Sequence, residues 1–293
     1  MRIGLGTAQF GMDYGISNAA GQVPAAEARK ILALAESAGV RVIDTARAYG
    51  DAETRLGQWL AKDHPFSIVT KLAGPAEGAA ASSVKRWVHD AFQSSLQRLR
   101  ATHVHGLLVH GAGDLLGARG AETWRAMETL RDDGAVAKIG VSVYTGLEID
   151  ALLDRYPLQL VQLPLNVLDQ RLVRSGHLER LKAAGVEVHA RSAFLQGLLL
   201  MDVPASLDRH FDPARSALDA FHAAARAAGR SPLEAAVSYV MSVDQVDTAI
   251  FGVTTTTQLA GILAAATRTM PPGWFAPFAL DDERILDPSQ WPR

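Results

Sequence analysis

Short apolar runs alternate with longer amphipathic segments from one end of the chain to the other. The runs are nearly continuous in Val, Ile and Leu, which is typical of parallel strands that helices cover. Eight such runs occur, at 2–6, 40–45, 67–71, 104–110, 138–143, 160–165, 187–192 and 248–253. The pattern therefore predicts eight strands.

The segments between the runs carry helical periodicity. In segment 24–38, Ala28, Ile31 and Leu32 recur at three- and four-residue steps, and Gly39 is suited to end the helix. Periodicity or helix-start signals also predict helices at 83–100, 121–133, 171–184, 213–229, 231–242 and 256–266. Strand-like runs that alternate with helices eight times favour a (β/α)8 TIM barrel, an α/β fold, over a doubly wound open sheet.

We expect residues 1–293 to form a single domain, because no linker or shift in composition marks a second one. Two helical segments, 213–229 and 231–242, both fall between the seventh and eighth runs. One of them is expected to be an insertion. The tail at 271–293 is rich in proline and aromatic residues, and we expect it to pack on the barrel as a loop.

Composition and charge exclude several classes of function. Lys and Arg number 29 against 31 Asp and Glu, a formal net charge of −2, which argues against binding of nucleic acid through its phosphates. The chain has no cysteine, so disulfides, thiolate metal sites and a cysteine nucleophile are excluded. It has no apolar run long enough to cross a bilayer and no signal-peptide pattern, so a cytoplasmic protein is expected.

The second, third and fourth runs each deliver a polar side chain where they end. These are Asp44, Lys71 and His110, and Tyr49 follows Asp44 in the next loop. In a (β/α)8 barrel, the active site lies at the carboxyl ends of the strands. Taken singly, each residue has a structural explanation: a loop hydrogen bond, a solvated charge or packing. Their joint occurrence at one rim points to a site that donates protons.

The chemistry of such a group is specific. A free tyrosine has a pKa of about 10, too high for efficient proton donation near neutrality. A nearby ammonium is expected to lower that pKa, and a carboxylate would keep the buried ammonium charged. A histidine could hold a carbonyl oxygen while the proton arrives. The missing component is a hydride source, so we expect a nicotinamide cofactor beside these residues.

With these residues in view, the chain resembles the aldo-keto reductases over nearly its whole length. The matching stretches are GLGTAQFG at 4–11, DTARAYGDAE at 44–53, VTK at 69–71, SLQRL at 95–99, LLVH at 107–110, KIGVS at 138–142, VQLPLN at 161–166 and IFGVTTTTQL at 250–259. The resemblance implies a barrel that binds NADPH, or sometimes NADH, across the strand ends without a Rossmann fold. It implies interconversion of an aldehyde, ketone or sugar carbonyl with an alcohol.

The resemblance also assigns roles. Tyr49 would be the general acid/base, Lys71 and Asp44 would tune it, and His110 would orient the carbonyl. The cofactor contacts that it implies are Gly6 and Thr7 at the nicotinamide ribose, Ser142 and Gln162 at the carboxamide, Asn166 near the ring, and Ser192, Leu195 and Gly197 towards the pyrophosphate. The loop after the last strand would hold the 2′-phosphate through Gly252, Val253, Thr254, Thr256 and Gln258.

One departure concerns that last loop. In this family it normally contains Lys or Arg, whereas 251–258 reads FGVTTTTQ. Threonine hydroxyls and a helix N-terminus can still bind phosphate, but the charge-assisted fork is absent. NADPH is expected, and NADH or dual use stays open. The threonines are equally suited to capping the helix that follows.

Three other histidines, and a set of aromatic and apolar residues, each have a structural and a functional interpretation. His103 and His105 form a spaced pair, but they start the fourth run and lie on the opposite face from His110, so no metal site is expected there. His189 is interpreted as internal packing. An apolar substrate rim is expected from residues after the first strand and from the tail, namely Phe10, Met12, Tyr14, Trp274 and Phe275.

Two other functions remain open from the sequence. One is a redox-sensing or regulatory subunit that binds the cofactor with little turnover. The other is a barrel lyase or isomerase that uses Lys71 as a Schiff base, which the neighbouring Asp44 and Tyr49 argue against. The physiological substrate, the direction of reaction and the oligomeric state are not encoded in any motif.

Overall fold

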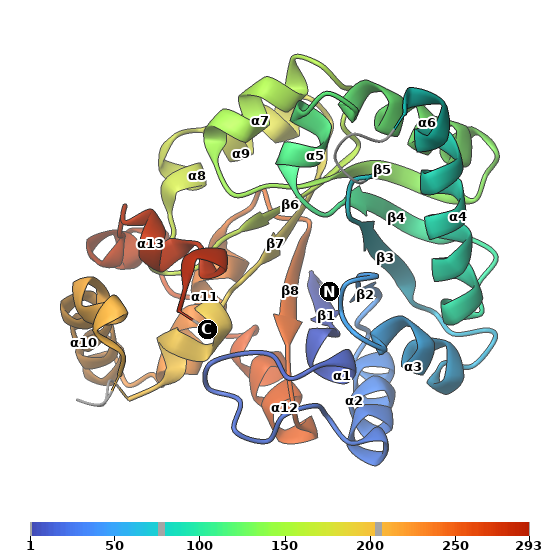
Figure 1. Cartoon of the computed structure of the whole chain (residues 1–293). Helices are drawn as coiled ribbons and strands as arrows, with labels where there is room; N and C mark the ends of the chain where they lie inside the picture. Colours follow the sequence, from blue (N-terminus) through green and yellow to red (C-terminus); the bar gives the residue numbers. More distant parts are fainter. Residues whose placement is uncertain (1, 76–79, 203–206, 293) are drawn as a thin grey trace.

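The computed structural model describes residues 2–75, 80–202 and 207–292. Its centre is a closed barrel in which each strand is parallel to both neighbours, in the order β1 to β8 (Figure 1). The strands are β1 Ile3–Gly6, β2 Val42–Asp44, β3 Ser67–Leu72, β4 Val104–Val109, β5 Val136–Ser142, β6 Leu160–Pro164, β7 Glu187–Arg191 and β8 Thr248–Gly252. All eight predicted runs are strands, and the (β/α)8 barrel is confirmed.

Helices surround the barrel and cover its outer face (Figure 1). The longer ones are α2 Ala25–Ser37, α3 Ala52–Trp59, α4 Ala81–Leu99, α6 Gly120–Asp132, α7 Gly146–Leu153, α9 His177–Ala183, α10 Asp212–Ala227, α11 Pro232–Ser242 and α12 Thr256–Ala265. Shorter turns are α1 Ala8–Gly11, α5 Ala112–Leu116, α8 Arg171–Arg174, α13 Glu283–Leu286, η1 Leu195–Leu200, η2 Arg209–Phe211, η3 Pro272–Phe278 and η4 Pro288–Gln290.

Local sequence signals explain where several helices begin and end. Gly39 follows α2 with a φ of 80°, a backbone conformation that glycine adopts without strain. The hydroxyl of Ser231 and the carboxylate of Glu234 form both bonds of a capping box at the start of α11. Thr145 and Glu148 form the same motif at α7, a helix that the sequence analysis did not predict.

The predicted helix at 171–184 is interrupted. It forms two short helices, α8 and α9, because Gly176 between them has a φ of 76°. The connection from β7 to β8 contains α10 and α11, as predicted. Helix α11 packs against α12, whereas α10 packs against α11, η2 and η3 and lies at the outside of the molecule in Figure 1. Helix α10 is therefore the inserted one.

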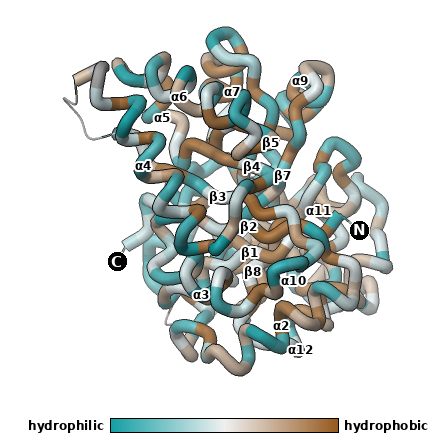
Figure 2. The backbone as a smooth tube through the Cα atoms, turned by 90° about the vertical axis from the view of Figure 1, so that its right-hand side faces the viewer, coloured by the Kyte–Doolittle hydropathy of each residue, from teal (hydrophilic) through white to brown (hydrophobic). Residues whose placement is uncertain are grey.

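The tail, described to residue 292, folds into η3, α13 and η4, where the sequence analysis expected a loop; residue 293 lies outside the described residues. Its apolar side chains are buried against the body of the protein, among them Phe275, Phe278, Ile285 and Leu286. Figure 2 shows the same distribution along the chain: brown, hydrophobic backbone in the strands at the centre, and teal segments on the helices around it.

The amino end of the barrel is closed by a charged cluster. Glu187 accepts a bond from Lys138 Nζ at 2.6 Å, and its oxygens lie 3.1 Å from His105 Nε2 and 2.7 Å from His189 Nε2. Burial alone would raise the pKa of Glu187, but the bonds from His105, His189 and Lys138 lower it well below its usual range. His105 and His189 thus hold a carboxylate in place at this end.

The described residues lack two features that would point to particular ligands or surroundings. They contain no group of three or more His, Cys, Asp or Glu side chains arranged to hold a metal ion. In the same residues, no helix combines the length and hydrophobicity needed to cross a membrane.

Candidate active site

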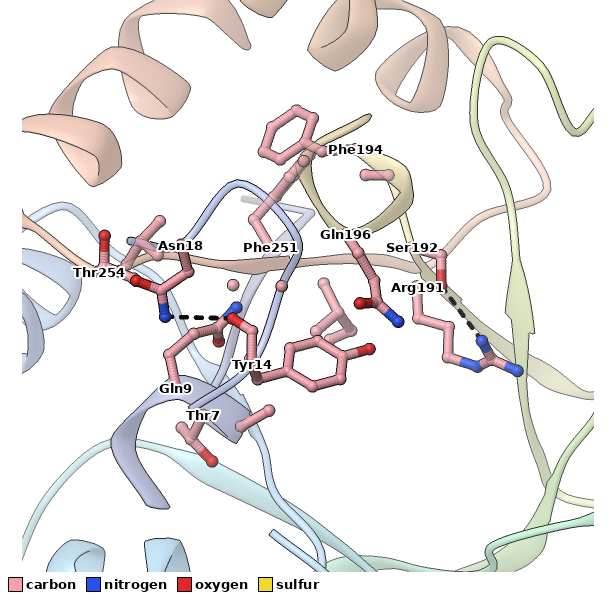
Figure 3. A pocket seen from close by; sticks show the side chains of 18 of the residues that line it. Thr7, Gln9, Tyr14, Asn18, Arg191, Ser192, Phe194, Gln196, Phe251 and Thr254 are labelled. Atoms are coloured by element: carbon pink, nitrogen blue, oxygen red, sulfur yellow. Dashed lines mark hydrogen bonds between the residues drawn. The ribbon is translucent and has the colours of Figure 1, made fainter. Parts of the chain in front are cut away.

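A cavity of about 600 Å³ opens at the carboxyl ends of the strands. Its wall includes Gly6, Asp44, Ser142 and Gly252, which end β1, β2, β5 and β8. Two loops complete it: the one after β1, around Tyr14 to Ala20, and the one after β7, around Ser192 to Gly197 (Figure 3). This is the end at which barrel enzymes place their chemistry.

A buried ion pair forms the floor of the cavity. Lys71 Nζ donates to both carboxylate oxygens of Asp44, at 2.7 and 2.8 Å, and to the carbonyl oxygen of Thr45 at 3.0 Å. The side chains are 1% and 5% exposed. Burial lowers the pKa of Lys71, and the Asp44 carboxylate opposes that effect. Gln162 Nε2 also donates to Asp44, at 2.7 Å.

Tyr49 and His110 lie directly above this pair. The Tyr49 hydroxyl is 3.4 Å from Lys71 Nζ, and the same ammonium lies 4.9 Å from the centre of the Tyr49 ring. The His110 ring meets the Tyr49 ring edge-on, with 5.8 Å between centroids. The four residues singled out from the sequence are therefore gathered into one cluster at the cavity.

The protonation of the cluster differs from the sequence-based expectation. Burial raises the pKa of Tyr49, the Asp44 carboxylate raises it further, and Arg191 offsets part of the rise. The expectation that Lys71 would bring the pKa of Tyr49 below its usual value is wrong, because burial dominates and the Lys71 charge is matched by Asp44. Burial, with the positive charges of Lys71 and Arg191, lowers the pKa of His110 to about 4. Phenol and imidazole are both uncharged near neutrality.

Other residues proposed for the cofactor also reach the cavity. Thr7 donates its hydroxyl to the carbonyl oxygen of Asp44 at 2.9 Å, and Ser142 accepts from Arg191 Nε at 3.3 Å. Gln162 lines the wall, and its Oε1 is buried without a partner among the described residues. On the β7 loop, Ser192 and Gly197 line the cavity with φ values of 58° and 97°.

Three proposed contacts are outside the wall. Leu195 is buried in the core. Asn166 uses its amide to join two loops: it donates to the carbonyl oxygen of Ser192, after β7, at 3.1 Å, and its Oδ1 accepts the N–H groups of Leu168 and Asp169, in its own loop, at 2.9 and 3.0 Å. Thr256 donates its N–H and hydroxyl to Glu27 Oε1, at 2.7 and 2.6 Å.

The loop after β8 is arranged as a helix cap that also faces the cavity. Gly252, Val253, Thr254 and Gln258 line it. Gln258 Oε1 accepts from the N–H and hydroxyl of Thr254, at 2.7 and 3.1 Å. Thr255 accepts from the Gln258 N–H and caps α12. The helix-cap interpretation holds for Thr255, and the cofactor contact of Thr254, which lines the cavity, stays a prediction.

The expected apolar rim is mostly wrong. Of the five residues proposed, Tyr14 lines the cavity. Phe10 is buried against Trp59, with ring centroids 6.2 Å apart, Trp274 and Phe275 pack in an aromatic cluster within the tail, and Met12 is not a lining residue. The apolar and aromatic residues in these segments do not by themselves distinguish a core side chain from a rim side chain, because the direction in which each side chain points depends on tertiary packing.

Sequence reasoning assigned no role to three residues that the structure brings to attention, namely Arg191, Tyr144 and Glu27. Arg191 ends β7, and its guanidinium lies 4.1 Å from the centre of the Tyr144 ring. Glu27 comes from α2, yet it reaches α12. The signal for Glu27 lies in the barrel closure: β1 pairs with β8, so the helices that follow these strands are neighbours.

Fold and site together define a barrel enzyme with a tyrosine–lysine–aspartate–histidine cluster at the mouth. The model of the aldo/keto reductase family matches residues 2–275. The chain therefore belongs to the aldo/keto reductase family, and it is an oxidoreductase of the class that interconverts carbonyls and alcohols.

Individual relatives and solved structures agree with this family and this fold. An aldo-keto reductase of Mycobacterium sp. (strain JLS) is 30% identical over 210 residues, which are 69% of this chain and 72% of the relative. The glycerol dehydrogenase AKR11B4 from Gluconobacter oxydans is similar with a TM-score of 0.70 and 25% identity, covering 97% of this chain and 91% of that one. The holo form of aldo-keto reductase AKR11C1 from Bacillus halodurans shares the fold, with a TM-score of 0.75, 20% identity, and 95% and 92% coverage.

The protonation of His110 can be measured directly. We expect its imidazole to titrate near pH 4, since burial and Lys71 disfavour the charged ring, whereas a free histidine titrates at about 6.5. An NMR titration of ring-labelled protein, with His110→Asn to assign the signal, gives the value. Because the unfolded ring takes up a proton at higher pH, this group makes stability fall as pH drops from about 6.5 towards 4. A pKa at or above about 6.5 would contradict the account.

Proposed function

We propose that the protein is an NAD(P)H-dependent oxidoreductase in which Tyr49 exchanges the proton while a carbonyl and an alcohol interconvert. The observation that carries this proposal is the contact of Lys71 Nζ with the Tyr49 hydroxyl at 3.4 Å, beside a cavity and above a buried carboxylate. The similarity to a glycerol dehydrogenase supports chemistry on an alcohol or its carbonyl.

The four residues divide the work. A nicotinamide cofactor, when bound, donates or accepts the hydride. In the reductive direction, the protonated Tyr49 phenol donates its proton to the alkoxide oxygen as it forms. Lys71 stabilises the phenolate that is left, and Asp44 keeps the ammonium charged and in place. The neutral His110 ring donates an N–H to the carbonyl oxygen, so the oxygen is held where the Tyr49 proton arrives.

The residues present fit a nicotinamide at the tetrad end of the cavity. Gln162 Oε1 is a buried acceptor with no partner in the described chain, and such an orphan is expected to be satisfied by a ligand or water. A carboxamide N–H would satisfy it, with Ser142 beside it. Gly6 and Thr7 border the same region, and Ser192 and Gly197 lead from it along the β7 loop.

The other end of the cavity favours NADH over NADPH. Gly252, Val253, Thr254 and Gln258 border this end without a basic side chain. Thr256, the first residue of α12, already donates its N–H and hydroxyl to the Glu27 carboxylate, and Lys30 is itself paired with Glu27 at 3.8 Å. A 2′-phosphate would meet negative charge there, whereas a carboxylate can accept a hydrogen bond from a ribose hydroxyl. NADPH binding is therefore expected to be the weaker.

Removing the Tyr49 hydroxyl tests the catalytic proposal. We expect Tyr49→Phe to lower kcat for carbonyl reduction by roughly 10²- to 10⁴-fold, the usual contribution of a general acid. The Kd for dinucleotide, from tryptophan fluorescence quenching, should change less than about twofold. Tyr156→Phe, which removes a hydroxyl bonded to the Leu115 carbonyl oxygen away from the cavity, serves as the matched control. Normal turnover in Tyr49→Phe, or lost dinucleotide binding, would sink this role.

Neutralising Glu27 tests the cofactor preference. Glu27→Gln keeps an oxygen that can accept from the Thr256 N–H but removes the charge. We expect the wild type to bind NADH more tightly than NADPH, and the variant to gain about fivefold in NADPH affinity, which corresponds to roughly 1 kcal/mol, with NADH affinity little changed. Binding titrations with both dinucleotides measure this. Tighter NADPH binding by the wild type, or an equal shift for both, would refute the preference.

A further inference from the structure

Glu53 is a buried carboxylate outside the cavity wall. It lies in the first turn of α3, is 2% exposed, and accepts a bond from the Thr70 hydroxyl at 2.7 Å. Thr70 is fully buried in β3, next to Lys71. In the described chain, this is the only hydrogen bond between α3 and β3. Burial of a carboxylate costs free energy that an apolar contact between a helix and a strand would not.

Arg98 of α4 joins the same junction. Its Nε lies 3.2 Å from the second carboxylate oxygen of Glu53. The Nε–H itself is directed at the Ser94 carbonyl oxygen, 3.3 Å away, so Arg98 meets Glu53 as a nearby charge and not through an aligned hydrogen bond. The two helices are also in close contact, since a Cβ on Gly57 would lie 2.1 Å from the Arg98 carbonyl oxygen. Helix α3 is thus attached to both α4 and β3.

The two sides of this junction carry Tyr49 and Lys71. Successive side chains of a strand point to opposite faces, so Lys71 enters the barrel while Thr70 faces α3. The Tyr49 carbonyl oxygen accepts the N–H of Ala52, the first residue of α3, at 3.1 Å. Tyr49 is therefore tied to the start of that helix. The bond from Thr70 to Glu53 links the segment that carries the general acid to the strand that carries the ammonium.

A close backbone contact confines the same turn from the side of α1. A Cβ on Gly11 would lie 1.8 Å from the Tyr49 carbonyl oxygen, and a Cβ on Gly50 would lie 2.2 Å from the Gly11 carbonyl oxygen. Glycine allows this approach, and Gly50 also has a φ of 56°, which glycine adopts without strain. Contact with α1 thus fixes one side of the turn, and the bond between Glu53 and Thr70 attaches it to β3.

We propose that Glu53 is a positioning residue for the proton transfer. By accepting the Thr70 hydroxyl, it holds the Tyr49 hydroxyl at 3.4 Å from Lys71 Nζ, the contact on which the stabilisation of the phenolate depends. The inference rests on the proposed function and adds to it a residue that does not touch the ligand cavity. A misplacement of about 1 Å in an active site can cost on the order of 10²-fold in rate. Loss of the bond is therefore expected to slow proton transfer while ligand binding persists.

Thr70→Val and Thr70→Ser form a matched pair that tests this, and both leave Glu53 beside Arg98. Valine suits a strand but cannot donate to Glu53, whereas serine can. For reduction of 4-nitrobenzaldehyde, we expect Thr70→Val to lower kcat about 10- to 100-fold, with KM and the dinucleotide Kd changed less than about twofold. Thr70→Ser should stay within about threefold of the wild type. Thr123→Val, which removes a buried hydroxyl that bonds no described residue in α6, serves as the control.

A second background separates positioning of Tyr49 from a general loosening of the fold. If the junction acts through the Tyr49 hydroxyl, Thr70→Val should cause less than about twofold further loss of kcat in a Tyr49→Phe protein. The same loss in both backgrounds would overturn the proposal. A wild-type kcat in Thr70→Val would overturn it as well, and so would a loss in Thr70→Ser as large as that in Thr70→Val.

The NMR signal of the ring-labelled His110 side chain gives a readout that does not depend on turnover. The Tyr49 ring meets the His110 ring edge-on, with 5.8 Å between centroids, so a displaced Tyr49 changes the chemical shift of His110. We expect a shift in Thr70→Val and none in Thr70→Ser or Thr123→Val. A shifted signal in Thr70→Val, with no aldehyde reduced by the wild type, would keep the positioning of Tyr49 and remove the reductase function. Aldehyde reduction by the wild type, with an unshifted signal in Thr70→Val, would remove the positioning role and keep the reductase function.

Discussion

The buried pair of Lys71 and Asp44 is the interaction on which the rest of the site depends. Asp44 pairs with Val69 across β2 and β3, and Lys71 lies two residues further along β3. Residues two apart share a face, so both side chains enter the barrel together. Removing one partner of such a pair leaves an uncompensated charge, at a cost of about 3–5 kcal/mol. The bonds from Gln162 and to the Thr45 carbonyl oxygen hold this pair in one geometry.

Because that pair is neutral overall, the other side chains of the cavity wall set its charge. Arg191 is a cation in the wall at the tetrad end, whereas Glu27 bonds Thr256 at the start of α12, is paired with Lys30 and is not a lining residue. Tyr49 and His110 stay uncharged near neutrality, so they can hold and protonate an oxygen without an opposing charge. The tetrad end of the cavity therefore offers uncharged donors to an oxygen, with one cation, Arg191, in the surrounding wall.

The sequence predicted the parts of the structure that depend on local pattern. Apolar runs marked all eight strands, and their ends marked the tetrad, because barrel closure brings strand ends together. Interactions that depend on tertiary packing could not be predicted from the sequence. Glu27 and Thr256, for example, are 229 residues apart in the chain. The raised pKa of Tyr49 likewise follows from its burial in the folded protein. Helix α7 was missed although Thr145 and Glu148 carry a capping-box signal. Asn166 matched a family motif, but its amide bonds backbone groups of its own loop and of the loop after β7.

A double-mutant cycle tests most directly whether Asp44 and Lys71 act as one unit on Tyr49. Asp44→Asn, Lys71→Met and the double variant are compared by kcat/KM for aldehyde reduction, with dinucleotide Kd measured alongside. The account predicts that each single change costs roughly 10²-fold or more, and that the double variant is within about threefold of the worse single variant, since either change already disables the unit. Effects that multiply in the double variant would contradict it.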